Sequence, residues 1–509
     1  MSRRRSWVSQ CIGKTFPLAL VLMSAGVFAA EQLIQQASPQ AKGAEEASTY
    51  DGRGVSLAQS GDLPAAIEQF RSALRLNPNY AEAWYHLGLA YNQARKTDDA
   101  MAGFEEALRL QPDYVEARYM FADCCRKRGD FAGELNVLAQ VVAHAPQFAE
   151  AHYNYGLALK SRDKPQTAVQ ELRAAVRLSP DNPKYMLALG IVLADVDRKE
   201  AVTVLHGAVQ RGANTADAHY NLGLALANDG DDTAAEQELN RALEMNPKHA
   251  SALRALGVTL MHDGKLEQAA TALQRALAAA PRDAEAANNL GTVQLRLKDH
   301  SGAIESLERA VALNPSLIKA HANLAQAYQR TGRPGDAARE SERVTSLTAQ
   351  LRRRGRAMIG VQSAREQFQS GRTAEAVATL RKVIEESPDF PDAQFELGRM
   401  IRDTDPNAAI GAFRRVLDLD PERAEAHYEI GITLEHAGHR TEALPEYQIA
   451  VEMAPCNLDA RRALAKAAAS AGQWSLAATQ YRAVLALEPH DDAARQQFAF
   501  AVARQKAAP

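Results

Sequence analysis

The feature that most constrains this chain is a line of sequence that it repeats along most of its length. Residues 218–230 read AHYNLGLALANDG, residues 151–163 read AHYNYGLALKSRD, and residues 426–438 read AHYEIGITLEHAG. A chain that repeats itself in this way grows by stacking similar units, without one enlarging core. The sequence therefore predicts a repeat array, in spite of a length that would otherwise indicate three or four domains.

Prolines mark the period of the repeat. The first series is spaced 34 residues apart and consists of Pro78, Pro112, Pro146 and Pro180. The next repeat has Gly212 near the expected proline. After it, the 34-residue spacing continues with Pro247, Pro281 and Pro315. The series resumes at Pro388, Pro421, Pro455 and Pro489. We interpret this as thirteen repeats, nine over residues 47–351 and four over 357–491, separated by a basic insertion at 352–356.

Each repeat reads as a pair of helices. In residues 216–249, one helical face is formed at the i, i+3, i+4, i+7 spacing by His219, Leu222, Gly223 and Leu226. After a turn, a second stripe is formed by Ala235, Leu239, Ala242 and Leu243. Gly223 and Ala235 lack bulk and allow the two helices to approach closely. Pro247 cannot continue the second helix and ends it. The chain is therefore predicted to be an all-α solenoid of helix-turn-helix repeats.

Residues 81–114 carry the clearest unit, and here the sequence resembles a known family. The signature positions are occupied by Trp84, Leu87, Gly88, Tyr91, Ala100, Phe104, Ala107 and Pro112. This pattern is similar to that of the tetratricopeptide repeat. The resemblance implies a right-handed superhelix whose concave groove is lined by the first helix of every repeat.

Polar and aromatic residues recur on that first helix and are our candidates for a peptide-binding groove. Counting from the first residue of each repeat, with Ala81 as position 1 of repeat 2, position 6 holds Asn154, Asn221, Asn289 and Asn323. In the family, asparagine at this position commonly holds the backbone of an extended peptide. Position 5 holds Tyr85, Tyr119, Tyr153 and Tyr220, which offer broad contact area at low entropic cost. The alternative is that both are consensus residues without a ligand.

Three places depart from the pattern. Gly52 and Arg53 lie within the first helix of repeat 1, which predicts a frayed helix. Repeat 3 has Arg118, Ala122 and Glu134 where Trp, Gly and Ala are usual. No proline separates repeats 9 and 10, so the last helix of repeat 9 is expected to run long and the superhelix to change direction.

The ends of the chain differ from the array. A basic segment and an uncharged apolar run over residues 16–30 predict an export signal cleaved after Ala29, hence a signal peptide at 1–29. An uncleaved anchor and a twin-arginine signal are the alternatives. Residues 30–46 read as a flexible linker and residues 492–509 as a C-terminal capping helix.

Charge and cysteine usage limit the partners. The formal net charge is −3, and removing the four basic residues of the signal leaves about −7, which argues against nucleic acid. Cys124, Cys125 and Cys456 would remain, an odd and sparse set that does not form a disulfide framework. We interpret Cys124 and Cys125 as small buried residues in preference to a redox role, because no second cysteine pair or nearby histidine accompanies them. Cys456 follows a turn proline and could be exposed, which leaves an intermolecular bridge open.

No catalytic or metal-binding motif is recognised. His152, His219, His321 and His427 share position 4 and are predicted to pack inside their own repeats, since metal ligands must converge on one ion. His436 and His439 lack further ligands. The segment LRRRGR at 351–356 is either a basic docking or protease-sensitive site or, as we prefer, a solvated helix end. We therefore predict no enzyme, no metal and no cofactor.

The sequence thus predicts an exported, bacterial, non-catalytic scaffold of the periplasm or cell envelope. After signal cleavage, we expect the protein not to be stably inserted in a membrane. Its concave groove would bind extended peptides or protein partners. Two alternatives remain open. The chain could be a substrate-presenting or adaptor subunit of an enzyme complex, like the repeat arms of glycosyltransferases, or a structural spacer without a groove ligand. The sequence does not settle the oligomeric state.

Overall fold

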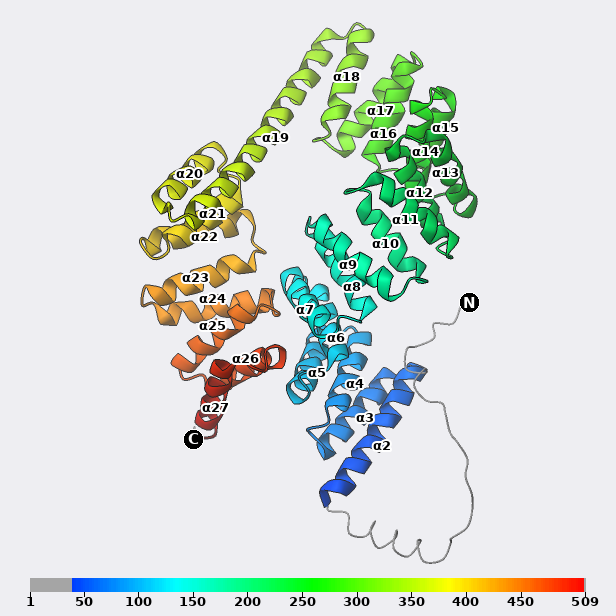
Figure 1. Ribbon diagram of the computed structural model, residues 1–509. Coiled ribbons are helices and arrows are strands. Elements are labelled where there is room, and N and C mark those ends of the chain that lie inside the picture. The colour runs from blue at the N-terminus through cyan, green and yellow to red at the C-terminus, as the bar shows by residue number, and fades with distance from the viewer. Residues whose placement is uncertain (1–38, 508–509) are drawn as a thin grey trace, which may run out of the picture.

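The computed structural model describes residues 39–507, which fold as 26 helices and contain no strand (Figure 1). Helices pair antiparallel within each repeat, and each pair stacks on the next along the chain. The prediction of an all-α helix-turn-helix solenoid is therefore confirmed. The signal peptide predicted at 1–29 lies outside the described residues.

The helices follow the repeat order. The first helices of repeats 1–9 are α2 (Pro39–Ser60), α4 (Ala81–Gln93), α6 (Val115–Lys127), α8 (Ala149–Ser161), α10 (Pro183–Leu193), α12 (Ala216–Asp229), α14 (Ala250–His262), α16 (Ala284–Arg296) and α18 (Ile318–Arg330). The second helices of repeats 1–8 are α3 (Leu63–Leu76), α5 (Thr97–Leu110), α7 (Phe131–His144), α9 (Pro165–Leu178), α11 (Arg198–Gln210), α13 (Asp232–Met245), α15 (Leu266–Ala279) and α17 (His300–Leu313). The remaining helices are α19 (Pro334–Gln369), α20 (Thr373–Glu386), α21 (Pro391–Ile401), α22 (Pro406–Leu419), α23 (Ala424–His436), α24 (Arg440–Met453), α25 (Leu458–Ser470), α26 (Trp474–Leu487) and α27 (Asp492–Ala507).

Repeat 6 shows why the unit folds. The Thr215 side chain caps α12 by accepting from the Ala218 N–H, and Gly230 ends the helix at a positive φ of 94°, which glycine adopts at little cost. Gly223 faces the second helix so closely that a Cβ there would lie 2.8 Å from Leu239 Cγ. The predicted close approach through Gly223 and the buried Ala235 is confirmed.

The first repeat differs from the prediction. Helix α2 begins at Pro39, so residues 39–46, predicted as linker, are helical, and α2 continues through Gly52 and Arg53 without fraying. Packing explains the continuity, because Gly54 lies directly against the buried Phe70 ring of α3. Burial of that face against α3 outweighs the low helix propensity of the glycines.

Helix α19 bridges the two parts of the array. It is 36 residues long and serves repeat 9 with its first half and repeat 10 with its second. The predicted lengthening of this helix is confirmed. The segment 351–356 lies in the middle of α19, so its interpretation as a helix end is wrong; Arg353 instead pairs with Asp389 at 3.2 Å.

Beyond α19 the chain returns toward its beginning. Figure 1 shows α20 to α26 running back toward the first repeats, and α26 packs against α5. Ala486 and Leu487 at the end of α26 belong to the same apolar cluster as Phe121 of α6. Helix α27 covers α26, with the Trp474 and Phe500 rings edge to face at 5.6 Å. The array thus closes on itself into a ring, and the helices at the two ends of the described chain are α2 and α27.

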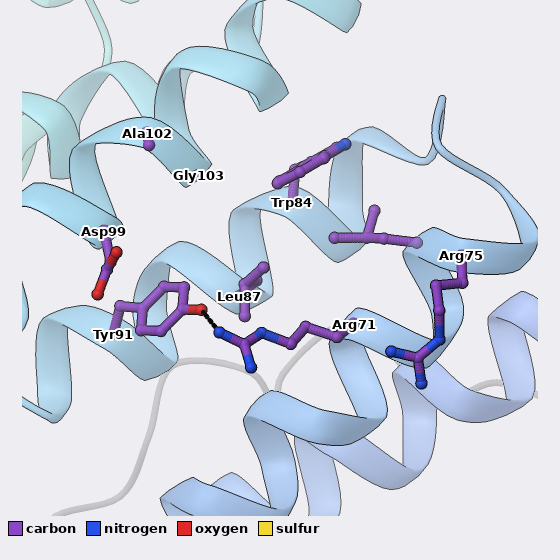
Figure 2. Close-up of a pocket in the computed structure, with 9 residues that line it drawn as sticks. Arg71, Arg75, Trp84, Leu87, Tyr91, Asp99, Ala102 and Gly103 are labelled. Carbon is purple, nitrogen blue, oxygen red and sulfur yellow. Dashed lines mark hydrogen bonds between the residues drawn. The ribbon is translucent and has the colours of Figure 1, made fainter.

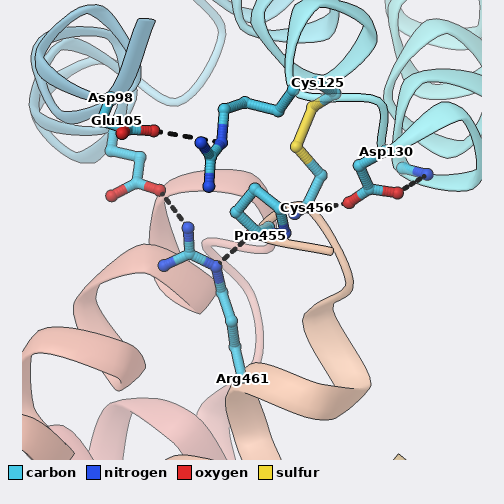
Figure 3. The surroundings of a disulfide bond; sticks show 9 residues. Asp98, Glu105, Cys125, Asp130, Pro455, Cys456 and Arg461 are labelled. Carbon is cyan, nitrogen blue, oxygen red and sulfur yellow. Dashed lines mark hydrogen bonds and ion pairs between the residues drawn. A yellow bond between two sulfur atoms is a disulfide. The ribbon is translucent and has the colours of Figure 1, made fainter. Parts of the chain in front are cut away.

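A disulfide crosses the point of closure. Cys125 of α6 is bonded to Cys456 in the turn between α24 and α25, 331 residues later (Figure 3). Cys125 is buried, as predicted, but it forms a disulfide, so it is not merely a small packing residue. The alternative of an exposed Cys456 that is open to an intermolecular bridge is wrong, because Cys456 is buried in this intramolecular bond. Cys124 is buried and free, as predicted. Closure of the ring brings together two cysteines that nearest-neighbour stacking would keep apart.

Within residues 39–507, no helix combines the length and the apolar character that a membrane crossing requires.

Candidate peptide-binding groove

The histidines at position 4 pack inside their own repeats. In each of four repeats, Nδ1 of the histidine lies within hydrogen-bond distance of a glutamate 19 residues later, on the second helix. The pairs are His152–Glu171 at 2.7 Å, His219–Glu238 at 2.6 Å, His321–Glu340 at 2.6 Å and His427–Glu446 at 2.7 Å. The prediction that they pack within their repeats is confirmed, and these residues tie the two helices of a repeat together.

The tyrosines at position 5 are half-buried, and each rests on an aromatic ring that lies just before, or in the first turn of, the first helix of the next repeat. Tyr85 contacts Tyr114 with ring centres 4.9 Å apart, and Tyr119 contacts Phe148 at 5.1 Å. Tyr153 and Tyr220 make the same kind of contact with Tyr185 and His249. Burial raises the pKa of Tyr85 to about 12. One side of each ring is therefore occupied by the segment that leads into the neighbouring repeat.

The asparagines at position 6 are also engaged in part. The Asn154 amide donates to the Tyr119 hydroxyl of the preceding repeat. The Asn323 amide donates to Asn288 Oδ1 at 3.1 Å and to Thr292 Oγ1 at 2.9 Å, again one repeat earlier. The Asn221 amide donates to Asp217 O in its own helix. Asn289 accepts a long 3.4 Å hydrogen bond from Asn288.

Two of these asparagines, Asn154 and Asn323, join the first helices of neighbouring repeats. Bonds from position 6 to position 5 of the preceding repeat connect the first helices directly, and His86 with Asp51 follows the same rule at 3.0 Å. The first helices of neighbouring repeats therefore lie side by side. The amide Oδ1 atoms of Asn154, Asn221 and Asn323 accept no hydrogen bond from the described part of the chain, so they can receive an N–H from a ligand.

Two of the predicted residues, Tyr119 and Asn154, line a hollow of about 800 Å³ between α6, α7 and α8. Apolar side chains that project into solvent border it: Phe131 is 44 % exposed and Leu157 is 36 % exposed. Because both flanking helices are first helices, the hollow opens on the side where these helices adjoin. Tyr85, Tyr153, Tyr220, Asn221, Asn289 and Asn323 do not line it.

The floor of the hollow holds an acidic group that consensus repeats lack. Glu134 is only 7 % exposed and lies 3.7 Å from Arg126, which also pairs with Asp123. Burial raises the pKa of Glu134 to about 7, and Arg126 offsets part of this effect. The hollow can therefore offer a carboxyl group that gains or loses a proton near neutrality.

A second pocket, of about 440 Å³, opens between α3, α4 and α5 on the side of the second helices. Figure 2 shows Trp84, Tyr91, Arg71 and Asp99 around it, with Arg71 donating to the Tyr91 hydroxyl at 2.8 Å. The Trp84 indole N–H donates to Pro78 O at 2.9 Å. These signature residues are thus engaged in holding repeats 1 and 2 together.

The sequence reasoning missed Phe131, Leu157 and Glu134. It identified repeat 3 as irregular through Arg118, Ala122 and Glu134 but did not connect that irregularity with a site. The signal was present, since a carboxylate at a position that usually holds alanine needs room and polar partners. Among residues 39–507 no cluster of metal-ligating side chains is found.

Comparison with known proteins agrees with this architecture. The tetratricopeptide-repeat profile matches residues 135–183, then overlapping segments that span 187–318, and 361–492. Related repeat profiles match residues 54–94 and 81–114. These matches cover more than half of the chain, and the chain belongs to the tetratricopeptide-repeat family. Proteins built on this repeat generally bind protein or peptide partners, so this chain is a protein-interaction scaffold.

Individual relatives are distant. The chain is 26 % identical over 165 residues to the BBSome complex member BBS4 homolog of Drosophila melanogaster, a match that covers 32 % of this chain and 34 % of that protein. It thus spans about a third of that relative's length. A match to an uncharacterised protein of Methanocaldococcus jannaschii is 36 % identical over 58 residues, covering 10 % of this chain and 67 % of that protein.

Solved structures resemble the chain only in part. A MamA structure from Desulfovibrio magneticus is 28 % identical and covers 33 % of this chain and 97 % of its own, with a TM-score of 0.31. YrrB, described as a TPR protein with an unusual peptide-binding site, is 23 % identical and covers 36 % of this chain and 95 % of its own, with a TM-score of 0.31.

Proposed function

We propose that this chain is a non-catalytic scaffold that binds an extended segment of a partner protein along its adjoining first helices, with the hollow of repeats 3 and 4 as the anchor. The observation that carries this proposal is the hollow itself, with exposed Phe131 and Leu157 beside Tyr119 and Asn154. Exposed apolar side chains grouped around a few polar atoms are typical of a binding site.

The ligand chemistry follows from the lining. An apolar side chain of the partner would be buried between Phe131 and Leu157, while its backbone N–H groups would donate to Oδ1 of Asn154. Arg126 and Glu134 offer one donor and one acceptor for a polar neighbour. Affinity would come from backbone contacts along the first helices, and selectivity from the hollow.

We also propose that the chain works outside the cytoplasm, in the periplasm or cell envelope of a bacterium. The basic and apolar leader supports this location. The disulfide between Cys125 and Cys456 is a second, independent support, because disulfides persist in oxidising compartments.

Site-specific photo-crosslinking tests the binding proposal. A photoreactive amino acid at Leu157 reports on the hollow, and one at the exposed Ala102 beside the second-helix pocket is the matched control. We expect protein adducts from position 157 in envelope extracts, identified by mass spectrometry, and their loss when Phe131→Ala is added. Equal adducts from position 102, or none from 157, would contradict the proposal.

A further inference from the structure

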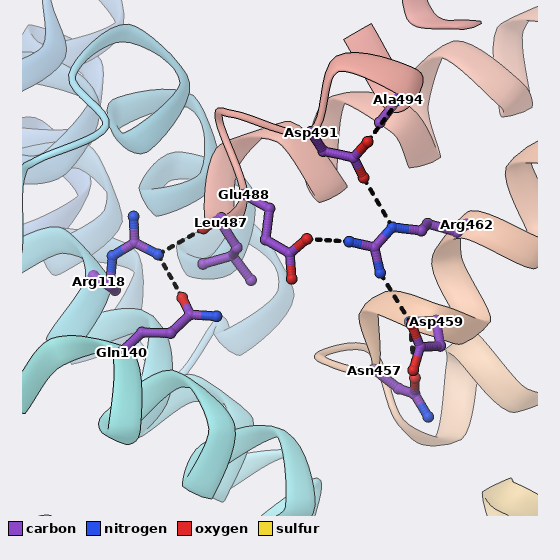
Figure 4. A network of polar contacts seen from close by, with 9 residues as sticks. All are labelled: Arg118, Gln140, Asn457, Asp459, Arg462, Leu487, Glu488, Asp491 and Ala494. Carbon is purple, nitrogen blue, oxygen red and sulfur yellow. Dashed lines mark hydrogen bonds and ion pairs between the residues drawn. The ribbon is translucent and has the colours of Figure 1, made fainter. Parts of the chain in front are cut away.

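Two arginines that depart from the repeat consensus make contacts across the point of closure. Arg461 occupies position 4 of repeat 13 and donates to Glu105 of α5 at 2.9 Å, as well as to Pro455 O (Figure 3). Arg118 occupies position 4 of repeat 3 and donates to Leu487 O at 2.9 Å and Gln140 Oε1 at 2.7 Å (Figure 4). The same position in regular repeats serves the repeat itself.

The disulfide lies at the centre of this closure. The buried Asp130 carboxylate accepts from the Gly133 N–H at 2.8 Å, where it caps α7, and from the Cys456 N–H at 2.8 Å. Gly133 makes room for the approach, since a Cβ there would lie 2.3 Å from Cys456 Cβ. The backbone of Cys456 in repeat 12 is thus held against Asp130 and Gly133 of repeat 3, next to the disulfide.

Both cysteines are enclosed by the closure that they lock. Cys125 is 0 % exposed and Cys456 is 2 % exposed. Repeats 3 and 12 are not neighbours in the stacking order, so their sulfur atoms meet only when the ring is closed. Once it is closed, a reductant has no surface path to either sulfur.

We propose that Cys125 and Cys456 form a redox staple: the dithiol chain exchanges between an open arc and a closed ring, and oxidation locks the ring. The proposal concerns the shape of the molecule and does not depend on the groove ligand. It requires that the polar contacts of Arg118, Arg461 and Asp130, together with the apolar packing of α26 on α5 and α6, bring the sulfur atoms together without holding the ring closed by themselves.

The chemistry is a thiol–disulfide exchange with a disulfide-bearing oxidant, either a protein disulfide or glutathione disulfide. One thiolate of the pair attacks the oxidant's disulfide, forms a mixed disulfide and releases the first oxidant thiol. The second cysteine of the pair, as its thiolate, then attacks the mixed disulfide and releases the second oxidant thiol. Two protein thiols lose two electrons and two protons, which the two released thiols carry.

Small-angle X-ray scattering of the full chain tests the proposal. We expect the oxidised protein to scatter as one compact ring, and both the reduced protein and the Cys125→Ser/Cys456→Ser variant to show a larger radius of gyration. Cys124→Ser is the matched control, because Cys124 is adjacent, buried and free, and it should behave as the parent does. Identical radii in oxidised and reduced protein would overturn the proposal, since the ring would then close without the staple.

A second experiment measures closure through the sulfur atoms themselves. Gly133→Ala should slow formation of the 125–456 linkage, followed by mass spectrometry of unreduced peptides, at least tenfold. Gly302→Ala is the matched control: its Cβ would meet the capping Asp299 at 2.2 Å, much as Gly133 meets Asp130, but no distant repeat. Equal rates in the two variants, or a linkage through Cys124, would overturn the proposal.

The reverse reaction gives an independent readout. Arg461→Met weakens closure and should speed reduction of the folded protein by a small thiol at least fivefold, because opening precedes attack. Glu200→Gln, which removes the Arg173–Glu200 ion pair between repeats 4 and 5, is the control and should leave the rate unchanged. An unchanged rate in Arg461→Met would show that reduction does not require opening, which contradicts the proposal.

Discussion

Repeat 6 and repeat 3 use the same positions of the same unit for different purposes. In repeat 6, His219 at position 4 lies against Glu238 of its own second helix. In repeat 3, Arg118 at position 4 reaches Leu487 at the other end of the array. The profile matches reflect this difference, because they include repeat 6 but omit residues 115–134. Residues that match the repeat consensus hold the helices of regular repeats together. Residues that depart from the consensus, such as Arg118, make contacts that occur only once in the array.

The comparison predicts how damage spreads. Phe121→Ala removes a fully buried ring from repeat 3 and should cost about 3–5 kcal/mol. Its apolar cluster includes Leu487 and Cys456, so amide exchange should rise both in residues 115–141 and in 456–487.

Leu222→Ala is the matched change in repeat 6 and should cost about 2–5 kcal/mol. In a nearest-neighbour array its effect should stay within repeats 5 to 7. If both variants loosened only their adjacent repeats, ring closure would not couple the stability of repeat 3 to that of repeat 13, and the contrast between repeats 3 and 6 would be wrong.

The fold was predictable because its determinants are local. The spacing of residues such as Leu222, Gly223 and Leu239 recurs in every regular repeat, and stacking follows from burial of that face. Closure was not predictable by the same means. Cys125 and Cys456 pair only because the whole ring returns to its beginning, a property that no single repeat encodes.

The candidate site was predictable to a similar degree. The family resemblance placed the position 5 and position 6 residues on the first helix, and they do lie there. Their mutual contacts, such as that of Asn154 with Tyr119, were not visible in the sequence because they depend on the stacking geometry. The hollow was missed because Glu134 was treated as an irregularity of the repeat.

A polar contact at the closure should have the next largest effect. Arg118→Met keeps the length of the side chain but removes its bonds to Leu487 O and Gln140, at a cost of about 1.5–3 kcal/mol. We expect faster amide exchange at residues 484–491 with little change in repeats 6 to 9. Protection of 484–491 equal to that of the parent would show that apolar packing alone closes the ring.

The pH dependence of stability should distinguish repeat 3 from the regular repeats. The pKa of Glu134 is raised to about 7, so between its ordinary value and 7 the folded chain keeps a proton that the unfolded chain releases. Stability of repeat 3 should therefore fall as pH rises through this window, by about 1–2 kcal/mol between pH 5.5 and 7.5.

Glu134→Gln removes the titrating group and should abolish this fall, raising the stability of repeat 3 at pH 7.5 above that of the parent. Amide exchange in residues 115–141, corrected for intrinsic rates, measures it, and residues 216–245 serve as the internal control. A pH dependence that persists in the variant would assign the effect to another group.

The smallest expected effect distinguishes a structural asparagine from one available to a ligand. Asn323→Ala removes hydrogen bonds to Asn288 and Thr292 of the preceding repeat, which should cost about 0.5–1.5 kcal/mol and loosen the contact between α16 and α18. Asn221→Ala removes only a bond within its own helix, to Asp217 O, and should cost less than about 0.5 kcal/mol. Amide exchange of the two helix pairs compares these costs directly. If binding of a crosslinked partner then falls in Asn221→Ala while its stability is unchanged, the asparagine acts on the ligand. If binding falls only where stability falls, as in Asn323→Ala, the position 6 residues serve the array and the hollow alone provides recognition.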